Sequence, residues 1–132
     1  MRRMHLLALG LFLAVPAVPC LAAEHTKDSL ETVKKKLDDK KAVLVDVREE
    51  NEWDAGHVRS AILLPLSKLK DGLDPKELLK TLPKDKVIYC HCGSGRRCLS
   101  AAEVLKKQGY DVRPLKPGFK DLIEAGFPKA DK

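Results

Sequence analysis

The sequence predicts a single α/β domain in which helices flank a mainly parallel β-sheet. Three runs of apolar residues are short and nearly uninterrupted, as is typical of strands that are buried on both faces: 42–47, 61–64 and 87–91. Segments with helical patterns alternate with these runs, and such alternation is typical of parallel sheets. The chain has 132 residues, which favours one domain.

The first 22 residues have the pattern of a secretory signal peptide. A basic start is followed by the apolar run Leu6–Val15, which is too short to span a bilayer as a helix, and then by proline and small residues. Cleavage after Ala22 or Ala23 leaves one domain, 23–132, and we expect export, in a bacterium to the periplasm. A lipid anchor at Cys20 is disfavoured, because the residues before it match a lipobox poorly.

Charge patterning indicates which partners to expect. The chain carries a net charge of +6, which falls to +4 when Arg2 and Arg3 leave with the signal peptide. Opposite charges are interspersed along the remaining chain, as is typical of a solvated surface. We therefore expect no nucleic-acid partner and no membrane span in the mature domain.

The order of the remaining elements follows from periodicity and turn residues. The sequence predicts helices over 28–40, 74–80, 98–108 and 119–125, a short turn or helix over 48–54, and a fourth strand over 112–115. Proline within that fourth strand indicates an edge position, because proline cannot donate to a central ladder.

Capping residues support several of these boundaries. Asp28 and Glu31 have the spacing of a capping box at the start of the first helix. Asp74 and Pro75 provide an N-cap and a first-turn proline for the helix over 74–80. Gly109 follows the helix over 98–108, where glycine commonly ends a helix.

We expect structural roles for four polar or aromatic residues at and after the end of the first strand. We expect Asp46 and Arg48 to form a polar pair near the end of the sheet. We expect Trp53 to pack in the core and His57 to make hydrogen bonds within its turn.

A loop with the sequence Cys92-Gly93-Ser94-Gly95-Arg96-Arg97 joins the strand over 87–91 to the following helix. Backbone N–H groups of such a loop, together with the helix N-terminus, favour anions. A cysteine at this place is expected to ionise readily, because the thiolate is the form that the loop stabilises. Two arginines add positive charge, and Gly95 is expected to adopt a positive φ, with Gly93 a second candidate. The pattern predicts a sulfur nucleophile that acts on an anionic substrate.

Three cysteines remain after cleavage, at positions 90, 92 and 98, all close to this loop. Such clustering indicates chemistry rather than a disulfide framework. Cys90 is expected to point into the core. We expect no metal, because His91 and these cysteines have no second group of ligands with which to complete a zinc site.

Two signatures in this chain resemble those of the rhodanese-like sulfurtransferases. Cys92-x-x-Gly95-x-Arg97, between an apolar strand and an Ala-Ala-Glu helix, resembles the family's active-site loop. The family's first signature is matched upstream of the loop by Asp46-Val47-Arg48, Glu52-Trp53, Gly56-His57-Val58, Ala61-Ile62 and Pro65-Leu66. Its closing segment is matched after the loop by Gly109-Tyr110, Pro117-Gly118-Phe119 and Gly126-Phe127-Pro128. The resemblance covers about 28–128, and the chain is most similar to single-domain periplasmic rhodaneses.

This resemblance implies a rhodanese-like three-layer sandwich and a two-step sulfur transfer without a cofactor. The Cys92 thiolate takes the outer sulfur of a small anionic donor such as thiosulfate, sulfite leaves, and the resulting persulfide passes its sulfur to cyanide, to a thiol or to a protein acceptor. The donor is expected to bind at Gly93, Ser94, Gly95, Arg96 and Arg97.

Some positions depart from the family pattern. Ser60, Leu63 and Leu122 replace residues that the family usually has for packing. Cys98 stands where the family usually has serine, and this difference concerns chemistry. We expect Cys98 to be more exposed than Cys90 and to act as a resolving thiol. In an oxidising compartment, a disulfide from Cys98 to Cys92 would silence the loop.

Three other functions remain open at this point. The domain could be a persulfide carrier or a regulatory rhodanese-like module that binds a partner. Counted from Cys90, the sequence also fits the Cys-x5-Arg loop of cysteine-dependent phosphatases and arsenate reductases, although this leaves Cys92 without a role. Thiol–disulfide exchange is disfavoured, because the Cys-x-Cys spacing is not the usual Cys-x-x-Cys.

Overall fold

A four-stranded parallel sheet lies at the centre of the protein, for which the computed structural model describes residues 22–131. The strands are β1 (Ala42–Asp46), β2 (Ala61–Leu63), β3 (Val87–His91) and β4 (Val112–Pro114), in the spatial order β2-β1-β3-β4. Asp46 of β1 lies beside His91 of β3, so the two central strands end together. The predicted parallel sheet is confirmed, with β4 at an edge.

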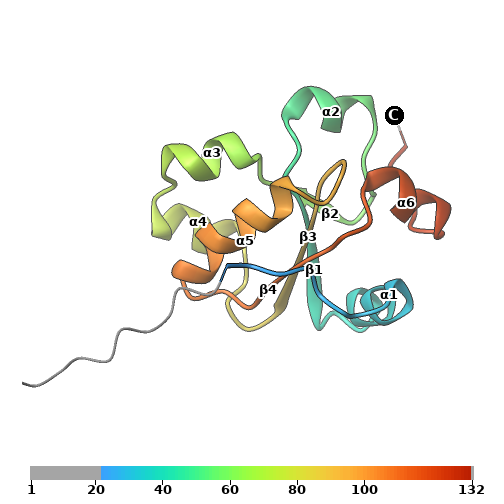
Figure 1. The fold of residues 1–132 in the computed structure, drawn as a ribbon, viewed down its shortest axis with the longest axis horizontal. Coiled ribbons are helices and arrows are strands. Elements are labelled where there is room, and N and C mark those ends of the chain that lie inside the picture. The colour runs from blue at the N-terminus through green and yellow to red at the C-terminus, as the bar shows by residue number, and fades with distance from the viewer. Residues whose placement is uncertain (1–21, 132) are drawn as a thin grey trace, which may run out of the picture.

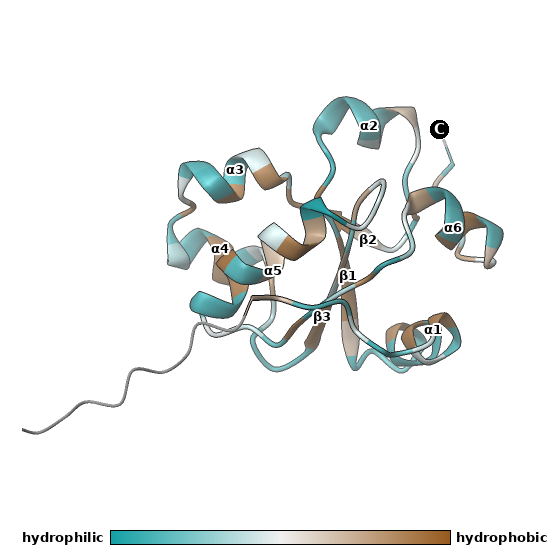
Figure 2. Ribbon diagram, in the orientation of Figure 1, coloured by the Kyte–Doolittle hydropathy of each residue, from teal (hydrophilic) through white to brown (hydrophobic). Residues whose placement is uncertain are grey.

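The described residues form six helices, and all but one pack on the two faces of the sheet to give three layers (Figure 1). They are α1 (Leu30–Asp38), α2 (Glu50–Ala55), α3 (Leu66–Asp71), α4 (Pro75–Thr81), α5 (Arg97–Lys107) and α6 (Phe119–Glu124). Helices α1 and α6 cover one face of the sheet, α3, α4 and α5 cover the other, and α2 lies beyond the strand ends. The predicted three-layer sandwich is confirmed, and Figure 2 shows hydrophobic colour along the strands and hydrophilic colour on much of the helices.

Two apolar clusters form the core, one on each face of the sheet. Val45 belongs to the cluster beneath α3, α4 and α5, and its neighbour Leu44 belongs to the cluster beneath α1 and α6. Cys90 and Tyr89 alternate in the same way on β3. Because both faces are covered, these strands are apolar up to their last residues, Asp46 and His91. Burying each aliphatic side chain contributes about 1.5–3 kcal/mol.

The start of α1 differs from the predicted capping box. Ser29 is the N-cap, and its hydroxyl accepts a hydrogen bond from the backbone N–H of Thr32 over 3.1 Å. Asp28 instead accepts hydrogen bonds from the Tyr89 hydroxyl and the Arg113 guanidinium. Partners on β3 and β4 therefore determine the role of Asp28, and they lie far from it in the sequence.

In the segment from β1 to α4, the structure differs from two further predictions and confirms two others. Helix α3 was not predicted. Trp53, which was expected in the core, is half-buried and stacks on His57 with ring centroids 3.6 Å apart. His57 hydrogen bonds to the Trp53 carbonyl within its turn, as expected (3.0 Å). Asp74 caps α4 as predicted by accepting the backbone N–H of Lys76.

The predicted pair of Asp46 and Arg48 is confirmed as a buried ion pair at the end of β1. Their side-chain contacts measure 2.8–3.1 Å, and neither residue is more than 5% exposed. The Arg48 guanidinium also donates to the Gly56 carbonyl and lies 4.2 Å from the centre of the Phe119 ring. It thereby ties α2 and α6 to the central strand.

The connections at the carboxyl ends of β1 and β3 diverge. After β1 the chain continues to the edge strand β2, and after β3 it continues to β4 at the opposite edge. Open α/β sheets bind ligands at such a divergence. The Cys92 loop follows β3 at this point.

The N-terminal prediction stays a prediction. Residues 1–21, almost all of the predicted signal peptide, lie outside the described residues. Within 22–131, no helix has the length and apolar character needed to cross a membrane.

Candidate active site

The loop that carries Cys92 joins β3 to α5 (Figure 1). The backbone N–H of Gly95 donates to Cys92 Sγ over 3.1 Å. The backbones of Ser94 and of Cys98 also act on this sulfur and favour its charged form. Helix α5 begins at Arg97, so its positive dipole end is next to the loop. A negatively charged group at the sulfur would therefore lie among backbone donors.

Gly95 has the backbone conformation that the sequence predicts. Its φ is +84°, whereas Gly93 does not have a positive φ, so that second expectation was wrong. A Cβ atom on Gly95 would lie 2.7 Å from the carbonyl oxygen of Lys116. Both the turn of the loop and the close approach of the next segment require glycine here.

The segment before α6 holds the loop from one side. The backbone N–H of Phe119 donates to the carbonyl of Cys92 over 2.9 Å. Gly118 lies so close that a Cβ atom on it would be 1.9 Å from the carbonyl oxygen of Gly93. The closing signature therefore acts as a support of the loop, a role that the sequence alone did not reveal.

His25 supports the loop from the N-terminal segment. This segment runs along β4, where the backbone N–H of Thr26 donates to the carbonyl of Pro114 (2.8 Å). His25 Nε2 donates to the Gly95 carbonyl over 2.7 Å. Nothing in the local sequence pattern pointed to His25, since its partner lies 70 residues away.

Arg97 is paired with a carboxylate of α2. Its guanidinium contacts both carboxylate oxygens of Glu52, at 2.5 and 2.9 Å, and this contact lowers the pKa of Glu52 to about 2. A Cβ atom on Gly93 would lie 3.2 Å from the same guanidinium. The Arg97 guanidinium therefore lies at the loop, where Glu52 holds it. An anionic ligand would have to compete with the Glu52 carboxylate for this guanidinium. Arg96, Ser94 and Gly93 are exposed.

The three cysteines of the described chain are all free and fully buried. Cys98 was expected to be the more exposed thiol, and this was wrong: its Sγ contacts the carbonyl oxygens of Gly95 (3.1 Å) and Leu115 (3.2 Å). The expectation that Cys92 ionises readily also fails for this arrangement. The Cys98 side chain and burial raise the pKa of Cys92 to about 12, against the opposing effect of the backbone donors.

Cys90 lies in the core, as predicted. It belongs to β3, and its Sγ donates to the Cys98 carbonyl over 3.4 Å. Because Cys90 is part of the strand, the loop begins at Cys92. A Cys-x5-Arg loop counted from Cys90 is therefore not supported.

His91 is completely buried beside Asp46, with 3.7 Å between Nε2 and a carboxylate oxygen. Neither ring nitrogen has a hydrogen-bond partner among the described residues. Burial lowers the pKa of His91, so its ring is neutral near pH 7.

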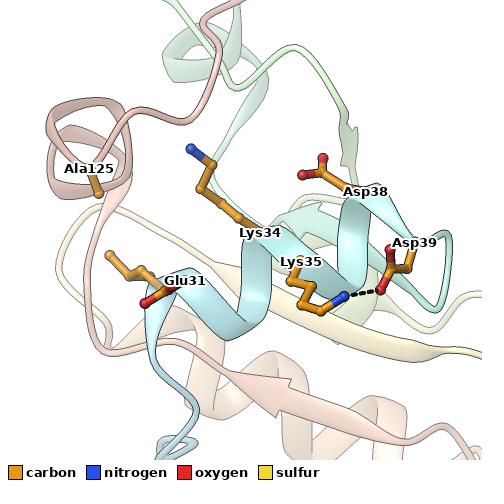
Figure 3. A pocket seen from close by; sticks show the side chains of 7 residues that line it. Glu31, Lys34, Lys35, Asp38, Asp39 and Ala125 are labelled. Carbon is orange, nitrogen blue, oxygen red and sulfur yellow. Dashed lines mark hydrogen bonds and ion pairs between the residues drawn. The ribbon is translucent and has the colours of Figure 1, made fainter.

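A hollow of about 460 Å³ lies away from this loop, between α1 and α6 (Figure 3). Charged side chains line it, and Lys35 pairs with Asp39 across 2.9 Å. It offers no cysteine, serine or histidine for covalent chemistry. Within the described residues, no group of three or more histidine, cysteine or acidic residues could hold a metal ion.

Comparison with known proteins gives a consistent family match. The family described as "Rhodanese-like domain" matches residues 29–125. The uncharacterized protein YqhL of Bacillus subtilis is 42% identical over 82 residues, which cover 61% of this chain and 60% of that protein. A putative mitochondrial thiosulfate sulfurtransferase of Schizosaccharomyces pombe is 34% identical, over 58% of this chain and 59% of that protein. The match thus spans about three-fifths of the length of these relatives.

A solved structure agrees with the fold. The rhodanese-related protein of Thermoplasma volcanium superposes with a TM-score of 0.59 and 28% identity. The superposition covers 76% of this chain and 93% of that one. Sequence and fold comparisons therefore point to the same family.

Proposed function

Because this chain belongs to the family of rhodanese-like domains, we propose that it is a sulfurtransferase that carries sulfane sulfur on Cys92. The observation that carries the proposal is the position of Cys92 Sγ, which accepts a hydrogen bond from the Gly95 amide beside the N-terminus of α5. Such a site can hold a sulfur anion and the charge of a leaving group. Sulfurtransferase relatives support the same reaction class.

The first step takes sulfur from an anionic donor such as thiosulfate. Cys92 first loses its thiol proton to solvent, which the raised pKa makes unfavourable until the loop moves. The thiolate then attacks the outer sulfur, the sulfur–sulfur bond of the donor breaks, and sulfite leaves with the electron pair. Gly93, Ser94, Gly95 and Arg96 offer backbone or side-chain donors around the entering anion. Arg97 supplies a guanidinium at the loop, in competition with Glu52.

The second step passes the sulfur to an acceptor. Cyanide or an external thiolate attacks the outer sulfur of the Cys92 persulfide, and the Cys92 thiolate leaves. The products are thiocyanate or a new persulfide on the acceptor, which could also be a protein thiol. No resident cofactor takes part in either step. Export to the periplasm is a further part of the proposal and rests on the N-terminal sequence pattern alone.

Thiocyanate formation from thiosulfate and cyanide tests the proposal. The purified protein is expected to be active, Cys92→Ser to be inactive, and Cys90→Ala to retain activity, since Cys90 lies in the core. Equal activity of the protein and of Cys92→Ser would refute the assignment of the nucleophile. Activity lost only in the Cys90 variant would restore the phosphatase-like numbering of the loop.

A persulfide carrier or partner-binding module is the second candidate. Cys92 has no exposed surface in this structure, so a donor reaches its sulfur only when the loop residues move. A protein partner that contacts the exposed Gly93 and Ser94 could produce this movement. Absence of turnover with free thiosulfate, together with transfer from a persulfidated protein donor, would favour the carrier.

A further inference from the structure

Cys98 is a buried nucleophilic group that the proposed sulfur transfer does not use. Its side chain is fully buried, in the first turn of α5. Its thiol lies near two carbonyl oxygens, those of Gly95 and Leu115, and so packs without an unpaired donor. These contacts explain how the thiol is accommodated. They do not explain its closeness to the sulfur of Cys92.

Gly95 connects the two thiols. Its N–H donates to Cys92 Sγ and its carbonyl oxygen accepts from Cys98 Sγ, each over 3.1 Å. The side chain of Cys98 raises the pKa of Cys92, and the backbone of Cys98 lowers it. Cys98 therefore places a second sulfur at the same residue of the loop that contacts the nucleophile.

The two sulfurs approach the loop from different sides. Cys98 Sγ lies against the Leu115 carbonyl, on the side of the core, whereas Gly93 and Ser94 form the exposed part of the loop. Resolution by Cys98 requires that a sulfur added to Cys92 extends toward that exposed part. Cys98 would then face the inner sulfur of the persulfide, with the outer sulfur as the leaving group.

We propose that Cys98 resolves the Cys92 persulfide by attack on its inner sulfur and thereby releases sulfide. This inference rests on the proposed function, because it begins from the persulfide that the first transfer step forms. It adds a second outcome for the bound sulfur, besides transfer to cyanide or an external thiol.

The step is balanced without an external oxidant. The Cys98 Sγ–Cys92 Sγ bond forms, the persulfide sulfur–sulfur bond breaks, and the outer sulfur leaves as HS⁻ with the proton of the Cys98 thiol. The sulfane sulfur is reduced to sulfide, and the two cysteines are oxidised to a disulfide. An external dithiol then reduces this disulfide and restores both thiols. The sum is thiosulfate plus dithiol giving sulfite, sulfide and the oxidised dithiol.

Cys98 is protonated in this arrangement, because the neighbouring Cys90 side chain and burial raise its pKa to about 12. Since a thiol attacks as its thiolate, the Cys98 proton must pass to the leaving sulfur as the new sulfur–sulfur bond forms. Cys90 contacts the carbonyl of Cys98 rather than Cys92. Cys90→Ala is therefore a matched control that removes a neighbouring buried thiol without removing the resolving one.

A single-turnover experiment tests the inference. The pre-reduced, desalted protein, Cys98→Ser, Cys98→Ala and Cys90→Ala are each mixed with excess thiosulfate, without oxygen, cyanide or reductant. Released sulfide and intact mass are measured. We expect the wild-type protein and Cys90→Ala to release one equivalent of sulfide and to become about 2 Da lighter, as two hydrogens are lost. We expect both Cys98 variants to release none and to become about 32 Da heavier, as a persulfide persists.

The other outcomes separate the two proposals. If the wild-type protein also keeps the persulfide mass without releasing sulfide, the resolving role is refuted and the sulfurtransferase proposal stands. Sulfide release from the Cys98 variants, or its loss in Cys90→Ala alone, likewise refutes the role of Cys98. If no form gains sulfur or releases sulfide, the first transfer step fails, and both proposals fall. Two different Cys98 substitutions protect the result against a folding defect of one of them.

Discussion

Replacing Gly118 by alanine tests whether the segment before α6 supports the Cys92 loop. The new Cβ atom would lie 1.9 Å from the Gly93 carbonyl oxygen, so the loop and this segment must separate by about 1 Å to reach the 3.0 Å that real contacts require. Because the φ of Gly118 is −87°, no backbone strain accompanies the change. Overpacking of this kind costs about 1–3 kcal/mol of unfolding free energy. A displacement near 1 Å at a reacting group can lower a rate by about 100-fold.

The assay combines urea unfolding with thiocyanate formation and with the rate of alkylation of Cys92. Gly72→Ala is the control, since Gly72 has a φ of +89° and nothing within 4 Å of the added Cβ atom. We expect that variant to lose about 1 kcal/mol through backbone strain and to keep its activity. If Gly118→Ala retains both wild-type stability and activity, the contact with Gly93 does not support the loop. A loss of stability with full activity would confine the contact to folding.

Three further predictions follow from contacts of the loop. Glu52→Gln is expected to remove part of the acid sensitivity of folding. The pKa of Glu52, lowered to about 2 beside Arg97, gives stability that is present above pH 4.5 and lost as the pH falls toward 2. Because about a third of each side chain of the Glu52–Arg97 pair is exposed, the pair contributes about 1–2 kcal/mol to the free energy of unfolding, measured in urea. Equal acid sensitivity of the variant and the wild type would refute this prediction. Cys98→Ala is expected to lower the pKa of Cys92 from about 12, because it removes the side chain that raises this pKa most. The pH profile of Cys92 alkylation by iodoacetamide should then shift to lower pH, and an unchanged profile would contradict the prediction. His25→Ala is expected to cost about 1 kcal/mol of unfolding free energy, which His25→Gln should partly restore by keeping a donor; no loss in the alanine variant would exclude a supporting hydrogen bond.

The sequence was sufficient where a feature depends on residues close to one another. The apolar strands, the turn at Gly95 and the position of Cys90 in the core follow from spacing along a short stretch. The Asp46–Arg48 pair is also local, since the two residues are separated by a single position at the end of β1. Side-chain alternation and turn geometry therefore determine these features before tertiary contacts are known.

Features that depend on distant segments could not be predicted in this way. Asp28 was expected to cap a helix, yet Tyr89 and Arg113 engage its carboxylate across 61 and 85 positions. The burial of Cys98 depends on the carbonyl of Leu115, from the segment after β4. The Cys98 thiol and the burial of Cys92 itself raise the pKa of Cys92, so a correct loop motif still led to a wrong expectation about ionisation.

Position 98 is the residue of this fold that most directly affects the fate of sulfur bound to Cys92. The residue after Arg97 lies in the first turn of α5, and its side chain contacts the carbonyl of Gly95, whose N–H contacts Cys92 Sγ. A hydroxyl at this place can donate a hydrogen bond to a persulfide but cannot break its sulfur–sulfur bond. A thiol at this place can do both. One atom at position 98 would then determine whether the bound sulfur waits for an external acceptor or leaves as sulfide, and the masses of the loaded wild-type and Cys98→Ser proteins, compared side by side, decide between the two.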